Sequence, residues 1–386
     1  MAVAGRSEDA AADGVAAALR EAGFVRFRVA PDGDPLAAAG LLARALAERD
    51  TPFQTSVVRS ARPATTDAAD TDDTTTVAVG GTAPADVRLD SPGSASEAAF
   101  EAARELGSDP DPILALAGAF TVPDATLAGS AAFEAARDRA LLEQQPGVAI
   151  PVTDLADGLA HTTLVHARFS GDRDAVCGLL DGHETADTDE QRRRVASIVA
   201  LAAAGAEDAT PRAAEAIERA LRPYAITSRS DDGPAAGAGF ATVGGYADVL
   251  RACAHERPGT GLALTLGHDA RDAALSAWRA HAERAHAAVR NAATARHRNL
   301  VVARVDTDAS LMTTARLLCD FRSPEPVVVV GETEAAAVGR DGRDLGTRMH
   351  EAATAADGDG AGGDRRGRAT FTDDEAFVAA FREAMT

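Results

Sequence analysis

Lysine does not occur anywhere in the 386 residues, so all 39 basic side chains are arginines. Acidic side chains number 59, which gives a formal net charge of −20. Such a balance excludes a generally basic protein, and any nucleic-acid surface must be a local arginine patch. The acidity itself indicates a halophilic protein, because in molar salt the Debye length is about 3 Å and self-repulsion is screened.

Cysteine is also scarce, with Cys177, Cys253 and Cys319 widely spaced and no Cys-x-x-Cys pair. This argues against a disulfide scaffold and a zinc site, and it favours a reducing cytoplasm. The N-terminal residues lack the apolar segment of a signal peptide. No run of about 18 uncharged apolar residues is present, so we expect a cytoplasmic protein without a membrane span. Aromatic residues make up only 4% of the chain, which predicts a core of Ala, Leu and Val.

Strands and helices alternate through the first third of the chain. Residues 24–30 read as a strand, 35–49 as a helix and 53–60 as a second strand. Further strands are predicted at 77–81 and 86–90, and further helices at 94–106 and 112–120. This alternation predicts an α/β fold with a doubly wound parallel sheet, in which ligands bind at the carboxyl ends of the strands. The polar stretch 61–76 has no periodicity and reads as a loop or disordered insert.

The rest of the chain divides into two further parts. Residues 126–205 have a helical pattern, whereas 206–386 return to alternating elements, with a Gly-rich, basic loop predicted at 357–371. We therefore expect an N-terminal α/β domain over 1–125, a helical connector over 126–205 and a smaller α/β domain over 206–386.

The first predicted strand leads into Ala30-Pro31-Asp32-Gly33-Asp34-Pro35. This register resembles the first motif of the DHH phosphoesterase superfamily, His-x-Asp-x-Asp-Gly after a strand, and in particular its archaeal RecJ-like branch. Asp32 and Asp34 match the motif, while Ala30 stands at the His position and Pro35 at the Gly position.

Three later segments resemble the superfamily's other motifs in the expected order. Ala78-Val79-Gly80 stands where the family has Asp-x-Gly, and Asp90-Ser91-Pro92 where it has Asp-His-His. In "GAFTV", Gly118 matches and Val122 stands at the Asp position, with Asp124 two residues later.

The second half is similar to the DHH-associated domain. "VGR" at 338–340 looks like the strand with a nucleic-acid-contacting arginine, which is Arg340 here. "AGGDRRGRA" at 361–369 looks like the family's Gly-Gly-His loop, with Asp364 in place of the His. The resemblance therefore implies a nucleic-acid-binding set of Arg340, Gly362, Gly363, Arg365, Arg366 and Arg368.

Active members of the superfamily hydrolyse phosphodiesters with two divalent metals, usually manganese. Two-metal chemistry needs carboxylate and imidazole ligands that hold the ions about 3.5–4 Å apart. Of the expected ligands only Asp32, Asp34 and Asp90 remain here. Each of them also has a structural interpretation as a turn residue or a helix cap, and Asp34 in particular can cap a helix that starts at Pro35.

Three functions follow from these residues. The resemblance implies a RecJ-like protein with a decayed nuclease site, which needs no cofactor. It would bind single-stranded DNA or RNA, or act in replication or repair beside the GINS complex and the replicative helicase. The first alternative is an active single-strand exonuclease that uses manganese or magnesium, with Asp124 as a further ligand. The second is a regulatory subunit of an active RecJ-like paralogue that binds no nucleic acid.

Overall fold

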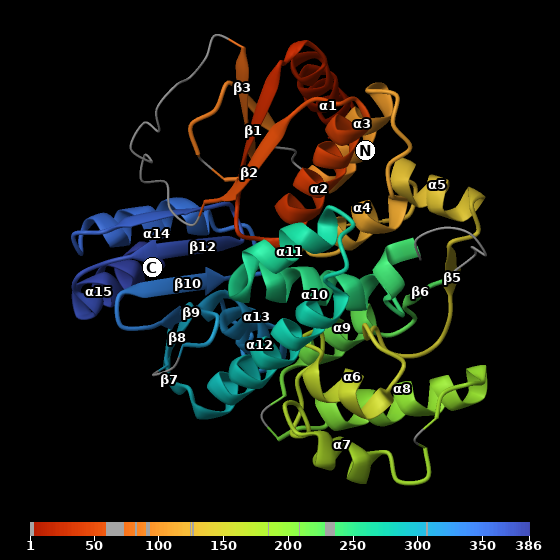
Figure 1. Ribbon diagram of the computed structural model, residues 1–386. Coiled ribbons are helices and arrows are strands. Elements are labelled where there is room, and N and C mark those ends of the chain that lie inside the picture. The colour runs from red at the N-terminus through yellow and green to blue at the C-terminus, as the bar shows by residue number, and fades with distance from the viewer. Residues whose placement is uncertain are drawn as a thin grey trace. The chain divides into compact units, whose positions relative to one another are not determined.

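The computed structural model of the chain consists of two compact units that are interleaved in the sequence (Figure 1). Unit 1 comprises residues 1–145, 149–153 and 223–278, and unit 2 comprises 146–148, 154–222 and 279–386. The structure describes residues 4–58, 73–81, 83–89, 93–123, 125, 127–183, 185–207, 209–227, 236–305 and 308–386. The contiguous division into 1–125, 126–205 and 206–386 therefore differs from the compact units, because residues 223–278 return to unit 1.

Unit 1 is built on a sheet of four parallel strands in the order β2-β1-β3-β4. The strands are β1 (Phe24–Val29), β2 (Phe53–Val57), β3 (Thr74–Val79) and β4 (Val87–Leu89). In β1, Val25, Phe27 and Val29 are buried and alternate with partly exposed residues, which is the period of a strand. Because β1 has β2 on one side and β3 on the other, the strand order reverses there, and its carboxyl end is the expected ligand position of such a sheet.

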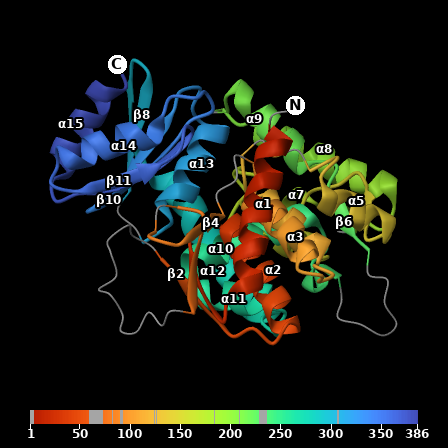
Figure 2. The same ribbon diagram turned by 90° about the horizontal axis from the view of Figure 1, so that it is seen from above.

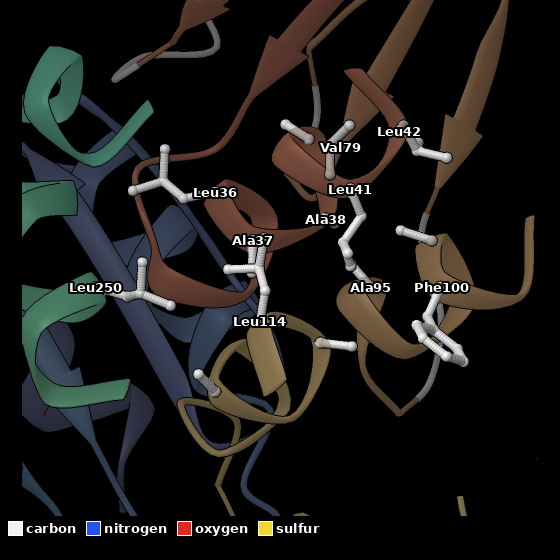
Figure 3. Close-up of a cluster of buried hydrophobic side chains, with 14 of the residues drawn as sticks. Leu36, Ala37, Ala38, Leu41, Leu42, Val79, Ala95, Phe100, Leu114 and Leu250 are labelled. Atoms are coloured by element: carbon white, nitrogen blue, oxygen red, sulfur yellow. The ribbon is translucent and has the colours of Figure 1, made fainter. Parts of the chain in front are cut away.

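Helices of unit 1 surround a core that is rich in Ala and Leu. They are α1 (Ala4–Glu21), α2 (Gly33–Glu48), α3 (Ala95–Glu105), α4 (Pro112–Ala119), α5 (Ala131–Asp138), α10 (Val243–Glu256) and α11 (Pro258–Thr265), with a 3-10 turn η1 (Ala236–Gly239). Figure 3 shows Leu36, Leu41 and Leu42 of α2 among side chains from β3, α3, α4 and α10. Small side chains allow these helices to approach closely, and α2 is buried along most of its length. A two-stranded antiparallel sheet of β5 (Leu142–Gln144) and β6 (Tyr224–Ile226) completes the unit.

Unit 2 combines a helical part with a six-stranded mixed sheet. Its helices are α6 (Leu155–His161), α7 (Arg173–Leu179), α8 (Asp189–Ala204), α9 (Pro211–Ala220), α13 (Leu311–Phe321), α14 (Leu345–Thr354) and α15 (Asp374–Ala384), and α12 (Arg271–Asn291) runs from unit 1 into unit 2. The sheet has the order β11-β12-β10-β9-β8-β7, in which only β8 and β9 are parallel. Its strands are β7 (Ala293–His297), β8 (Leu300–Arg304), β9 (Val327–Val330), β10 (Glu334–Val338), β11 (Asp359–Gly362) and β12 (Arg366–Thr370).

The two faces of this sheet carry different helices. Gly367 of β12 lies against Met349 of α14, and Phe371 stacks on Phe377 of α15. Both figures of the whole chain show α14 and α15 side by side (Figures 1 and 2). Helix α13 packs against β9 and β10 on the other face, where its Asp320 meets Arg340.

The predicted fold class is confirmed: a parallel α/β sheet in the first part of the chain and a separate sheet domain at its C-terminal end. Four strands were not predicted, namely β5, β6, β7 and β11. β7 lies at the exposed edge of the sheet, and β11 lies within the predicted 357–371 loop; "DGAG" has no apolar alternation, so only pairing with β12 makes it a strand. No helix in the described part of the chain is long and apolar enough to cross a membrane.

Candidate functional site

The turn after β1 holds both aspartates of the first motif, but it directs them to two different helices. Asp32 is the N-cap of α2, and its Oδ1 accepts a hydrogen bond of 2.8 Å from the Gly33 amide. Asp34 lies in the first turn of α2 and is buried. The helix therefore begins at Gly33 and is capped by Asp32, whereas the sequence had suggested a cap by Asp34.

The Asp34 carboxylate accepts hydrogen bonds from the start of α3. Its Oδ1 accepts from the Ser94 hydroxyl at 2.7 Å and from the Ser96 amide at 2.9 Å, and its Oδ2 accepts from the Ala95 amide at 2.7 Å. Burial raises the pKa of the Asp34 carboxyl, while the hydrogen bonds from Ser96, Ser94 and Ala95 oppose that rise. Asp34 thus satisfies backbone donors that a helix N-terminus leaves without intrahelical partners.

Ala30 and Pro35, which depart from the family motif, lie beside the end of β3. Gly80 follows β3 with a φ of +66°, a conformation that favours glycine. A Cβ at Gly80 would lie 2.8 Å from Pro35 Cγ and 3.3 Å from Ala30 Cβ. Apolar carbon atoms therefore stand against the end of β3, where the resemblance implies metal ligands.

The fourth motif is held by close helix packing. A Cβ at Gly118 would lie 2.5 Å from the Ser96 hydroxyl oxygen and 2.6 Å from Ala37 Cβ, so α4 needs glycine where it crosses α2 and α3. Thr121 donates to the Gly118 carbonyl at 2.8 Å and lies against Gly33. Two of the candidate ligands, Asp90 and Asp124, lie outside the described residues.

Among the described residues, the acidic donors at this sheet edge are Asp32 and Asp34, which are too few to hold a pair of divalent ions. Within the described residues, no three His, Cys, Asp or Glu side chains come together as metal ligands. The Asp34 carboxylate accepts three hydrogen bonds from the start of α3, and the Asp32 carboxylate accepts one from the Gly33 amide. Manganese or magnesium at this site would have to compete with the N-terminus of α3 for Asp34.

The C-terminal arginines gather on one face of the unit 2 sheet. On β12 the half-buried Arg366 and Arg368 alternate with the buried Gly367 and Ala369. In the ladder, Arg366 lies opposite Val338 and Arg368 opposite Ala336, and directly opposite residues share a face. Arg340 follows Val338 by two residues and reaches α13 on that face.

Asp364, which replaces the family's His, has a clear local contact. Its carboxylate accepts from the Asp344 amide at 2.9 Å, and its carbonyl accepts from the Leu345 amide at 3.1 Å. Asp344 is the N-cap of α14 but makes no side-chain capping hydrogen bond itself. The loop between β11 and β12 therefore caps α14 from outside the helix, with Gly363 contributing its carbonyl to the Gly346 amide at 2.8 Å.

Arg340 does not stand alone, because it shares the Asp320 carboxylate with two other arginines. Arg340 Nη2 lies 2.5 Å from Asp320 Oδ1, while Arg219 Nη2 and Arg316 Nη1 lie 3.5 Å and 3.9 Å from Oδ2. The Asp320 side chain is only 9% exposed, whereas that of Arg219 is 41% exposed. A buried carboxylate is stable in this setting because several cations surround it.

Sequence reasoning missed Ser94, Ser96 and Asp320. The pattern Ser94-Ala95-Ser96-Glu97 is a capping signature that predicts the start of α3, although it does not predict the contact with Asp34. Arg316 and Asp320 stand four residues apart on a helix, a spacing that favours an ion pair.

The chain is similar over nearly its whole length to a protein of the genus Haloarcula. A protein of Haloarcula marismortui described as uncharacterized protein rrnAC1427 is 49% identical over 386 residues, covering 96% of each chain. The chain belongs to the rrnAC1427 family. The model of the rrnAC1427 C-terminal domain matches residues 292–383, which run from β7 into α15.

The solved structure of CDC45 agrees in overall fold with this rrnAC1427-family protein. CDC45 from Entamoeba histolytica aligns with a TM-score of 0.56 at 9% identity, over 99% of both chains. RecJ from Thermus thermophilus, solved with Mg²⁺, aligns with a TM-score of 0.48 at 14% identity, over 98% of this chain and 52% of that one. The chain thus has a fold similar to that of CDC45.

Proposed function

We propose that this protein binds single-stranded nucleic acid without cutting it, and that it serves as a structural subunit in DNA replication or repair. The proposed contact surface is the arginine face of unit 2, defined as Arg340, Arg366 and Arg368, together with Arg365 in the adjoining loop. Gly362 and Gly363 let the backbone of the adjoining loop approach a phosphate.

The observation that carries the binding proposal is the shared face of Arg340, Arg366 and Arg368. In a chain of net charge −20 without lysine, three arginines on one sheet face are a local basic patch. Guanidinium groups suit phosphate because their donors form a planar fork that binds two oxygens at once. At molar salt, counterion release contributes little, so such directional hydrogen bonds matter more.

The loss of cutting is supported by the turn after β1. Asp34 accepts hydrogen bonds from the start of α3, and Pro35 and Ala30 bring carbon atoms against Gly80. A centre with two cations needs several free carboxylate or imidazole ligands at fixed spacing, and the described residues at this edge offer Asp32 alone beside Asp34.

Binding is tested by fluorescence anisotropy with a labelled oligothymidylate over a series of potassium chloride concentrations. The double variant Arg366→Gln/Arg368→Gln is expected to weaken binding, and the slope of log affinity against log salt is expected to fall by about 2, or about 1 per phosphate contact. The matched control is Arg193→Gln/Arg382→Gln, which removes two exposed arginines from α8 and α15. An unchanged slope in the first variant would exclude this surface.

Cutting is tested by incubating the same oligonucleotide with manganese or with magnesium. We expect the oligonucleotide to stay intact. Metal-dependent cleavage that disappears in Asp32→Ala would instead establish the exonuclease alternative. If no oligonucleotide binds, the regulatory-subunit alternative gains support, and recovery of GINS or of a RecJ-like paralogue with tagged protein from native cells separates the two partner classes.

A further inference from the structure

Helix α9 brings a second arginine pair toward the arginine face. Arg212 and Arg219 are seven residues apart, so about two helical turns place them on the same side of α9. That side faces α13, because Arg219 pairs with Asp320 and Arg212 Nη1 lies 4.0 Å from Cys319 Sγ. Burial raises the pKa of the Cys319 thiol to about 11, so this sulfur stays protonated and adds no negative charge.

Asp320 is the point where these elements meet. Its two oxygens face guanidinium groups from three elements: Arg219 on α9, Arg316 on α13 itself and Arg340 after β10. Exposure increases outward from the carboxylate, from 9% for Asp320 and 14% for Arg316 to 22% for Arg340 and 41% for Arg219. The carboxylate thus lies beneath the two arginines that reach furthest toward solvent.

We propose that Asp320 positions Arg219 and Arg340 as one clamp for a nucleic-acid phosphate, which extends the arginine face onto helix α9. The inference rests on the proposed function, since it names a further contact and its support. Arg316 is held on its other side by the Thr163 hydroxyl, which accepts from its Nη2 at 2.7 Å, so this arginine fixes the carboxylate from behind. A guanidinium that is already oriented loses less freedom when a phosphate binds.

The positioning role of Asp320 and simple electrostatics predict opposite changes in oligonucleotide affinity. Asp320→Asn removes a negative charge, and on electrostatic attraction alone it would strengthen binding to an anion. As a positioning residue, Asp320 is instead expected to be needed, so that Asp320→Asn weakens oligonucleotide binding and Asp320→Glu restores part of it. If Asp320→Asn bound the oligonucleotide as tightly as the wild type or more tightly, the Asp320 carboxylate would be competing with phosphate for the arginines. That result would overturn the proposal.

Arg219→Gln provides the second, independent measurement, because this exposed guanidinium lies farther from the Asp320 carboxylate than that of Arg340. The salt slope of oligothymidylate binding is expected to fall by about 1 relative to the wild type. The control is Arg193→Gln, which removes an exposed arginine from α8 and should leave the salt slope of binding unchanged. Should Asp320→Asn fail to fold in a thermal scan, Arg219→Gln carries the test alone, and an unchanged slope overturns the clamp.

The outcomes also separate the clamp from the function on which it rests. A wild-type protein that binds no oligonucleotide overturns both. A wild type that binds and loses affinity in Arg366→Gln/Arg368→Gln, but not in Arg219→Gln, overturns the clamp and leaves the proposed function intact.

Discussion

At the scale of single residues, Asp34 differs most from its predicted role, because it holds the start of α3 and does not cap α2. Its replacement by Asn is expected to destabilise the fold by about 1–3 kcal/mol, because an amide group would face the Ala95 or Ser96 amide with a donor. Chemical denaturation of Asp34→Asn measures the effect. Asp138→Asn, at an exposed position at the end of α5, should change stability by less than about 0.5 kcal/mol. Equal stability of the two variants would mean that Asp34 does not hold α3.

His166 gives a second prediction at this scale. It is buried against His286, with their Nδ1 atoms 3.0 Å apart, and burial first, then His286, Arg322 and Arg290, lower its pKa to about 2. The unfolded chain binds a proton below its ordinary pKa of about 6.5, whereas the folded chain does not. Stability is therefore expected to fall as the pH drops below about 6.5.

Thermal unfolding of the wild type and of His166→Leu between pH 8 and pH 5 tests this. The variant is expected to lose less stability over that range, because one proton-binding difference between the two states is gone. His268→Gln changes an exposed histidine and should leave the wild-type slope in place. If His166→Leu has the same slope as the wild type, the buried pair is not the source of the pH dependence.

At the scale of elements, α14 and β11 depend on the absence of a side chain at Gly346. A Cβ there would lie 2.4 Å from the carbonyl carbon of Gly362, so Gly346→Ala must push the helix away from the strand. We expect a loss of about 1–3 kcal/mol, which is typical of overpacking. Gly363→Ala is the matched control, since a Cβ at Gly363 meets nothing within 4 Å. Equal denaturation midpoints for both variants would contradict the close approach.

The elements also show how far sequence reasoning reaches. A β-branched and aromatic run predicted β1, and an alanine-rich stretch predicted α2, because both patterns depend on neighbours in the chain. The pairing that makes β11 a strand and the contact of Asp34 with α3 depend on residues far away in the sequence, so no local pattern reveals them. The sequence shows that Ala30 and Pro35 depart from the motif. It does not show that both residues lie against Gly80.

At the scale of the whole molecule, the surplus of acidic residues sets the salt dependence of stability. The Debye length shrinks from about 10 Å at 0.1 M salt to about 3 Å at 1 M, which screens the self-repulsion of a chain with net charge −20. We therefore expect the unfolding midpoint to rise as potassium chloride increases from about 0.1 M to molar concentrations, as thermal scans would show. An uncharged osmolyte such as sucrose serves as the control for solvent exclusion. A midpoint that is flat in salt would contradict the halophilic interpretation.

The interleaved units have a consequence for synthesis of the chain. Helices α10 and α11 belong to unit 1 but follow most of the helical part of unit 2 in the sequence. A ribosome that has released the first 145 residues has therefore delivered an N-terminal sheet whose last covering helices do not yet exist. Domains usually fold as they emerge, N-terminal part first, but here the first unit becomes whole only when residue 278 is available. The length of the nascent chain, rather than the order of the domains, therefore decides when each unit can complete its hydrophobic core.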